Sequence, residues 1–111
     1  MTAEEKDFDT EFLSHTMAVA AVRGVEDAIK HINTHSSKHS DSIVAASKET
    51  ADRFMNGVDS CGVYWNASTR FADGVRYGFG TEVAISTSKI HARGPVGRLG
   101  RLDLLSISAE R

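Results

Sequence analysis

The fold is decided by one stretch, DSIVAASKETADRFMNGVDSCGVYW, which runs from Asp41 to Trp65. Its opening residues 41–46 and its closing residues 61–65 are short apolar runs, which we predict to be strands. Residues 48–56 lie between them and have a helical pattern. A strand, a helix and a further strand in this order favour a parallel pair joined by a right-handed crossover.

The predicted helix in this stretch has clear end signals. Ser47 is a good N-cap, because its side chain can accept a hydrogen bond from the first helical turn. Ala51, Phe54 and Met55 recur at helical spacing and are expected to face inward. Gly57 is expected to end the helix as a C-cap.

Upstream of this stretch we predict a second helix over residues 24–34, because apolar residues recur there at helical spacing: Val25, Ala28, Ile29 and Ile32. The run from Thr16 to Val22 suits a strand buried on both faces, and a buried helical turn is the alternative. Residues 1–10 are acidic and are expected to be a poorly ordered lead-in. The predicted fold class is α/β with a mainly parallel sheet.

The composition bounds the possible functions. The chain has 111 residues, of which 41% are hydrophobic and 25% charged, and this suits one domain or part of one. A net charge of −2 gives no general attraction to nucleic acid or membranes. No apolar run approaches the roughly 20 residues that a membrane span needs. Cys61 is the single cysteine, which excludes an internal disulfide and fits a reducing compartment.

Residues 66–97 form a stretch rich in glycine and cationic side chains. Guanidinium groups and hydroxyls beside glycines are typical of anion-binding loops, because they offer forked donors and room to approach. The alternative is a pair of surface loops with scattered charges. The candidate binding residues are Asn66, Ser68, Thr69, Arg70 and Arg93.

Several motifs carry a resemblance to a known family. NASTRF at 66–71, GFG at 78–80 and HARGPVG at 91–97 follow one another, and a second signature runs from Val22 to Ile43. Together they resemble γ-glutamyl phosphate reductase (glutamate-5-semialdehyde dehydrogenase), which also forms half of the bifunctional pyrroline-5-carboxylate synthase. The resemblance assigns residues 11–97 to the C-terminal part of an aldehyde dehydrogenase-like catalytic domain, and 98–111 to a divergent tail.

The resemblance implies a reaction of proline biosynthesis. A cysteine thiolate attacks γ-glutamyl phosphate, phosphate leaves, and NADPH delivers hydride to the thioester, which gives glutamate-5-semialdehyde. Cys61 does not match the family's nucleophile, and we expect it to be a small buried residue of a strand. The chain is therefore interpreted as a fragment of the enzyme, without a catalytic residue and inactive alone.

The resemblance also implies roles for individual residues. Arg70 and Arg93 are expected to hold the phosphate or carboxylates of the substrate, because guanidinium forks suit both anions. The alternative is that they clamp loop backbone or pair with Asp73 or Glu82. Glu11 aligns with the glutamate that contacts the nicotinamide ribose in aldehyde dehydrogenases, which makes it the candidate cofactor-binding residue for NADP.

Three histidines spaced by four residues, His31, His35 and His39, could in principle chelate zinc. The preferred interpretation is a polar helix end with imidazoles facing solvent, and no metal is predicted.

A second hypothesis for the function is a non-catalytic interaction module left from the same fold. A fragment of a sheet exposes edges and apolar faces, so it would pair with another copy or with the missing N-terminal half. No nucleic-acid or membrane partner is expected. The expected location is the cytoplasm, or the mitochondrion if the parent is a bifunctional animal synthase.

Overall fold

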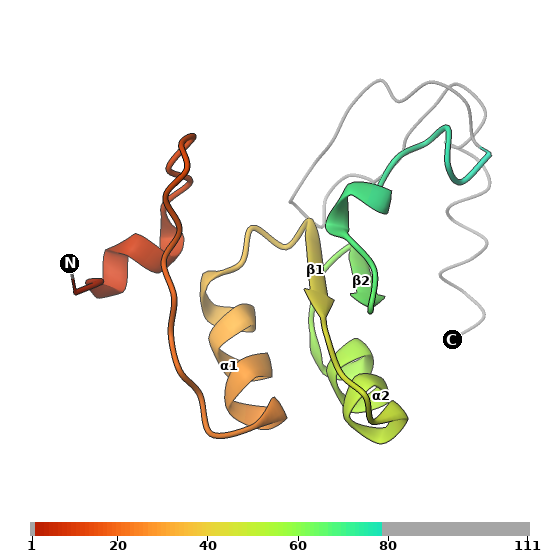
Figure 1. Cartoon of the computed structure of the whole chain (residues 1–111), viewed down its shortest axis with the longest axis horizontal. Coiled ribbons are helices and arrows are strands. Elements are labelled where there is room, and N and C mark those ends of the chain that lie inside the picture. The colour runs from red at the N-terminus through yellow and green to blue at the C-terminus, as the bar shows by residue number, and fades with distance from the viewer. Residues whose placement is uncertain (1, 79–111) are drawn as a thin grey trace.

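The computed structural model describes residues 2–78 as a small α/β unit (Figure 1). The elements in chain order are the 3-10 helix η1 (Glu5–Asp9), α1 (Val25–His35), β1 (Ser40–Ile43), α2 (Lys48–Gly57), β2 (Gly62–Trp65) and the 3-10 helix η2 (Thr69–Phe71). Within residues 2–78 no helix is long and apolar enough to cross a membrane.

The two described strands are parallel, as predicted. The register pairs Ser40 with Gly62 and Ile43 with Trp65. The ladder continues past the strand ends, because the N–H of Asn66 donates to the carbonyl of Ile43 at 2.9 Å. Helix α2 forms the connection between the strands, so the predicted strand–helix–strand unit is confirmed.

Helix α2 supplies the core of the unit. Ser47 caps it as predicted, with its side chain accepting a hydrogen bond from the N–H of Thr50 at 3.3 Å. Ala51 is fully buried, Phe54 is 2% exposed and Val58, which follows the helix, is 7% exposed. The core is small because it rests on one face of one helix.

Gly57 has a different role from the predicted C-cap. It is the last residue of α2, and the cap is Val58, whose backbone is extended. A Cβ added at Gly57 would lie 2.8 Å from Cδ1 of Ile29 on α1. A side chain at residue 57 would therefore force Ile29 to shift, and glycine allows the two helices to pack closely without that shift.

A side-chain amide joins the two helices at this point. Nδ2 of Asn33 on α1 donates to the carbonyl of Gly57 at 2.8 Å, and its Oδ1 accepts from the N–H of Asp59 at 2.8 Å. The amide satisfies a carbonyl and an N–H at the end of α2 that the helix itself leaves unpaired.

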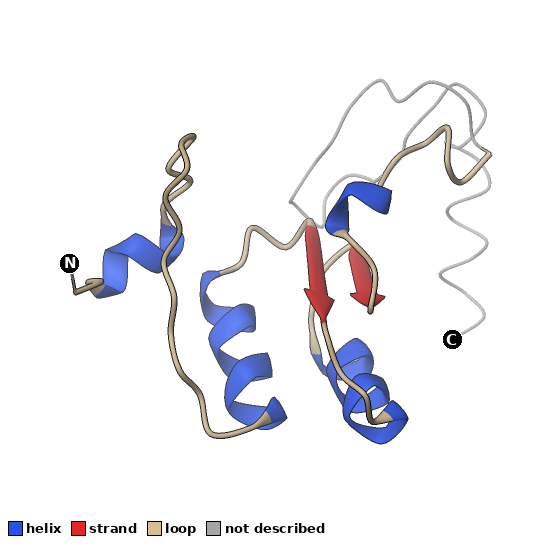
Figure 2. Cartoon of the chain, viewed as in Figure 1, coloured by secondary structure: helices blue, strands red, loops and turns tan. Residues whose placement is uncertain are grey.

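The run from Thr16 to Val22 is not a strand, contrary to the prediction. Figure 2 shows loop between η1 and α1, and no residue from 11 to 23 makes a backbone–backbone hydrogen bond within the described part of the chain. Met17 is 80% exposed and Val19 is 70% exposed. A strand is defined by its ladder partner, and residues 2–78 supply none for this run.

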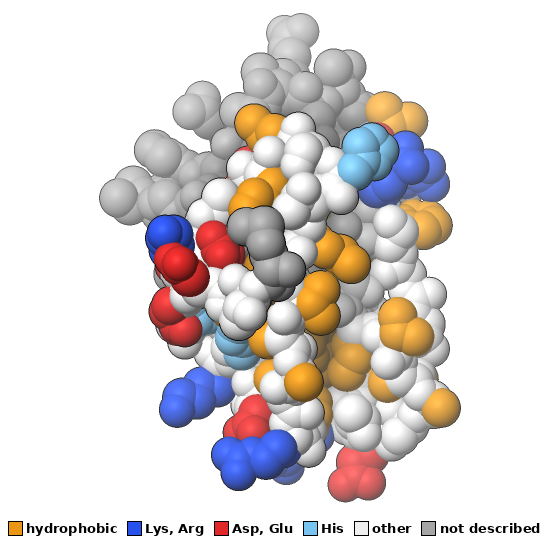
Figure 3. Space-filling view, turned by 60° about the vertical axis from the view of Figure 1, so that its left-hand side comes forward, with side chains coloured by type: hydrophobic (Ala, Val, Ile, Leu, Met, Phe, Trp, Pro, Cys, Tyr) orange, Lys and Arg blue, Asp and Glu red, His pale blue; other side chains and the backbone are white. Residues whose placement is uncertain are grey.

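Met17, Val19 and Val22 of this run are exposed, and Figure 3 shows hydrophobic side chains on one face of the molecule. The first ten residues also differ from the prediction of a poorly ordered lead-in. Residues 5–9 form η1, which packs on α1.

Candidate functional site

The segment from Asn66 to Arg70 begins at the carboxyl end of β2 and then turns back. The backbone of Asn66 has φ 52°, in the left-handed region, which reverses the chain. The carbonyl of Ala67 then accepts a hydrogen bond from Oγ of Ser42 in β1 at 2.6 Å. In Figure 1, η2 lies near the amino ends of the strands.

This path corrects one expectation from the sequence. Ligands in open parallel sheets bind beyond the carboxyl ends of the strands, and the NASTR segment directly follows the strand predicted at 61–65. The sequence therefore predicts that the whole segment lies beyond that end. Only Asn66 lies there. The reversal at Asn66 carries the following residues back along the sheet.

The side chain of Asn66 holds the reversal in place. Its Oδ1 accepts from the N–H of Ala45 at 3.0 Å, and its Nδ2 donates to the carbonyl of Ala45 at 3.0 Å. The indole Nε1 of Trp65 donates to the same carbonyl at 2.8 Å. The loops that follow β1 and β2 are therefore tied together at one backbone unit, Ala45, which sequence reasoning did not single out.

The remaining candidate residues of this segment lie on the surface. Oγ of Ser68 accepts from the N–H of Arg70 at 3.2 Å and so caps η2. Thr69 and Arg70 are exposed. Within residues 2–78 the guanidinium of Arg70 makes no ion pair, and Oδ1 of Asp73 accepts from the N–H of Val75 at 2.8 Å instead.

Arg93 and Glu82 lie outside the described residues, so the structure does not place them. Glu11, the candidate cofactor-binding residue, lies in the loop after η1 and is exposed.

Cys61 is exposed, contrary to the prediction that it is buried in a strand. It precedes β2, which begins at Gly62, and its N–H donates to the carbonyl of Lys38 at 3.1 Å. The thiol therefore belongs to the turn that enters the sheet.

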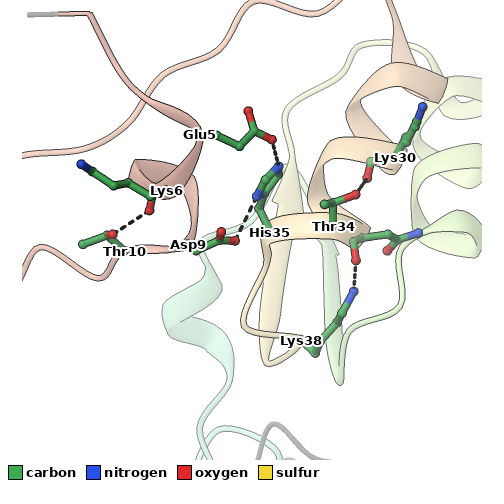
Figure 4. Close-up of polar contacts among 9 residues, drawn as sticks. Glu5, Lys6, Asp9, Thr10, Lys30, Thr34, His35 and Lys38 are labelled. Atoms are coloured by element: carbon green, nitrogen blue, oxygen red, sulfur yellow. Dashed lines mark hydrogen bonds and ion pairs between the residues drawn. The ribbon is translucent and has the colours of Figure 1, made fainter.

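The histidines of α1 were predicted to face solvent, but the structure places them against η1. The side chain of His35 is only 11% exposed, with Nδ1 2.9 Å from Oδ1 of Asp9 and Nε2 3.3 Å from Oε1 of Glu5 (Figure 4). The ring of His31 lies 4.6 Å from that of His35 and 4.8 Å from that of Phe8. The two imidazoles thus bind η1 to α1.

His39 lies apart from this pair, with Nδ1 2.8 Å from Oγ of Ser40. Among residues 2–78 no group of three His, Cys, Asp or Glu side chains is arranged to hold a metal ion.

Replacing His35 with alanine is expected to release η1 from α1. The change removes the partner of two carboxylates, so we expect amide exchange at Asp7 and Thr10 to speed up about tenfold. Hydrogen–deuterium exchange with mass spectrometry measures this directly. His39→Ala is the matched control and should leave these amides unchanged. Equal exchange in the His35→Ala and unmodified chains would contradict the assigned role.

Tyr64 of β2 is a second polar feature that the sequence did not indicate. Its hydroxyl forms a hydrogen bond with the hydroxyl of Tyr77. Partial burial raises the pKa of Tyr64 well above its ordinary value, and the hydrogen bond to Tyr77 adds to the rise. The folded chain therefore favours the neutral phenol.

This raised pKa predicts a loss of stability in alkali. In the unfolded chain Tyr64 ionises near pH 10, whereas the folded chain keeps the proton to higher pH. The stabilising contribution is complete below about pH 10 and is lost as the pH rises through the folded value. We expect Tyr64→Phe to reduce the fall in unfolding free energy above pH 10 by less than about 1 kcal/mol per pH unit, because the phenol is partly solvated. Urea titrations at pH 9 and pH 11 measure it, and equal slopes in both chains would contradict it.

Comparison with known proteins gives a consistent result. No protein-family model matches the chain. The chain is 70% identical over 94 residues to the γ-glutamyl phosphate reductase of Saccharomyces cerevisiae, an alignment covering 85% of this chain and 21% of the relative. It is 60% identical over 100 residues to that of Acetivibrio thermocellus, covering 90% of this chain and 23% of the relative.

The crystal structure of γ-glutamyl phosphate reductase from Thermotoga maritima matches with a TM-score of 0.80 and 47% identity. The match covers 86% of this chain and 23% of that chain. The chain therefore spans about a fifth of the length of the curated relatives that it matches.

Proposed function

We propose that this chain, which is homologous to part of γ-glutamyl phosphate reductase, is a segment of an oxidoreductase that converts γ-glutamyl phosphate to glutamate-5-semialdehyde in proline biosynthesis. The observation that carries the proposal is the 70% identity over 94 residues with the Saccharomyces cerevisiae reductase. The structural match to the Thermotoga maritima reductase, with a TM-score of 0.80, supports it.

The role of the segment is to bind the substrate. γ-Glutamyl phosphate carries a phosphate and a carboxylate, and a guanidinium fork can donate two parallel hydrogen bonds to either anion. Arg70 suits this role because its side chain is exposed and makes no ion pair within residues 2–78. Arg93 is proposed as the second guanidinium, and the hydroxyls of Ser68 and Thr69 as neutral donors.

NADPH supplies the hydride when it is bound, and Glu11 is the residue of this segment proposed to contact it. The carboxylate of Glu11 is exposed on a loop, which fits an acceptor for ribose hydroxyl groups. The nucleophilic thiolate is not assigned to this segment. Cys61 lies in the turn before β2 and does not match the position of the family's nucleophile.

A chimeric enzyme tests the proposal. The 94 aligned residues of the Saccharomyces cerevisiae reductase are replaced by those of this chain. The assay runs in the reverse direction, in which glutamate-5-semialdehyde, NADP⁺ and inorganic phosphate give the acyl phosphate, NADPH and a proton. We expect the chimera to keep at least about a tenth of the parent kcat/KM, a loss of no more than about 1.4 kcal/mol. A chimera that folds like its parent but has no activity would contradict the proposal.

A second candidate function is an interaction module, and the exposed apolar run favours it. Leu13 is 88% exposed, Met17 80% and Val19 70%, and no backbone hydrogen bond pairs this run within residues 2–78. Such a surface would associate with a second copy or with the remainder of the reductase fold. Sedimentation of the 111-residue chain separates the two candidates, since a chain that stays monomeric and does not bind the truncated yeast enzyme is not such a module.

A further inference from the structure

We infer that Asn66 is a positioning residue, which fixes the path of the chain that carries Arg70. The inference rests on the proposed function, because Arg70 is the group that would meet the anion. The sequence predicted Asn66 as a hydrogen-bond donor to the substrate. The inference instead assigns it the role of holding the loop that leads to Arg70.

Two properties of Asn66 are used at once in this structure. Its backbone has φ 52°, which asparagine tolerates better than most residues that carry a Cβ. Its side-chain amide makes two hydrogen bonds with Ala45, one to the N–H and one to the carbonyl, both at 3.0 Å. Glycine would allow the reversal without the amide, and alanine would supply neither.

The amide of Asn66 therefore has its oxygen and one N–H engaged inside the chain. These two bonds hold the amide against Ala45, so its position is set by the loop that it closes. Ala45 is itself held in place, because its carbonyl also accepts a hydrogen bond from the indole of Trp65 at 2.8 Å.

A short series of contacts connects Asn66 to Arg70. Beyond Asn66, the Ala67 carbonyl accepts from Ser42 Oγ at 2.6 Å, which fixes the returning chain against β1. Ser68 Oγ then accepts from the N–H of Arg70 at 3.2 Å. Ala67 and Ser68 thus each make a hydrogen bond between the reversal and Arg70, so a change at Asn66 is expected to shift the backbone that carries the guanidinium.

The test uses the chimeric enzyme and its KM for inorganic phosphate and for glutamate-5-semialdehyde, which report the two anions separately. Arg70→Ala is expected to raise one of these KM values about 10- to 100-fold, because a charge-assisted contact is lost. Asn66→Gly and Asn66→Ala are expected to raise the same KM about tenfold. The increase should be larger for Asn66→Ala, because alanine also disfavours the positive φ that reverses the chain. The KM for NADP⁺ should not change.

A double substitution separates positioning from an independent role. If Asn66 acts through Arg70, Asn66→Ala should raise KM less than about twofold when Arg70 is already alanine. Multiplicative effects of the two substitutions would overturn the inference, as would an unchanged KM in Asn66→Gly. An Arg70→Ala enzyme with unchanged KM for both anions would overturn the proposed binding role and this inference together.

Two controls guard against a general loss of structure. Asn56 of α2 also uses its amide locally, with Nδ2 donating to the Asp52 carbonyl at 2.8 Å, so Asn56→Ala is the matched control and should leave all KM values unchanged. Asn66→Gly keeps the reversal accessible and is informative even if Asn66→Ala does not fold. A fall in thermal midpoint with no selective change in KM would assign Asn66 a purely structural role and overturn the inference.

Discussion

Replacing Phe54 with alanine is expected to lower the free energy of unfolding by about 3–5 kcal/mol. Phe54 is 2% exposed and lies among the few buried residues of the described chain, with Ala51 and Val58. The loss is large against the total of about 5–15 kcal/mol that holds a domain together, so the midpoint of urea unfolding is expected to fall sharply. Urea titration followed by circular dichroism measures the change.

Phe71→Ala is the matched control for this experiment. Phe71 is 46% exposed, so removing its ring should lower the free energy of unfolding by less than about 1 kcal/mol. A similar loss in both variants would mean that α2 does not supply the core.

Replacing Asn33 with alanine is the second large effect, with an expected loss of about 2–3 kcal/mol. The change leaves the carbonyl of Gly57 and the N–H of Asp59 without the partner that each has at 2.8 Å. A buried group that loses its partner costs about 1–3 kcal/mol, and solvent reaches this site in part. The same urea titration measures it.

Asn56→Ala is the control for Asn33, because within residues 2–78 its amide bonds to the Asp52 carbonyl of its own helix on an exposed surface. We expect less than about 0.5 kcal/mol there. If Asn33→Ala lowered the free energy of unfolding no more than Asn56→Ala does, the Asn33 amide would not be what joins α1 to the end of α2.

The elements that could be predicted from the sequence are those whose signals are local. The cap at Ser47 and the inward positions Ala51 and Phe54 define α2, and they need only the residues beside them. The same holds for β2, where an apolar run follows a helix. These elements were predicted within a residue or two of their bounds.

The features that could not be predicted depend on distant partners. His35 is covered by Glu5 and Asp9, which are far from it in sequence. A prediction from the residues beside His35 therefore places its side chain in solvent. The run from Thr16 to Val22 has the composition of a buried strand, but composition does not provide a partner strand.

The path of the candidate segment could be predicted only in part, for the same reason, and its binding role stays a prediction. The type and order of the residues from Asn66 to Arg70 indicated an anion-binding segment. The direction of that segment depends on one backbone angle at Asn66 and on the contact of its amide with Ala45, which lies 21 residues earlier in the chain. No local pattern specifies such a contact.

The parallel register of the sheet also limits the order in which this unit can fold. Ser40 pairs with Gly62, and the whole of α2 lies between them, so the ladder cannot start from a tight turn as in a hairpin. The entropy of closing that long connection is lost before the first inter-strand bond forms. Helix α2 and its contact with α1 are therefore expected to form first, and the Asn66 reversal, which needs both strands in place, should be completed last.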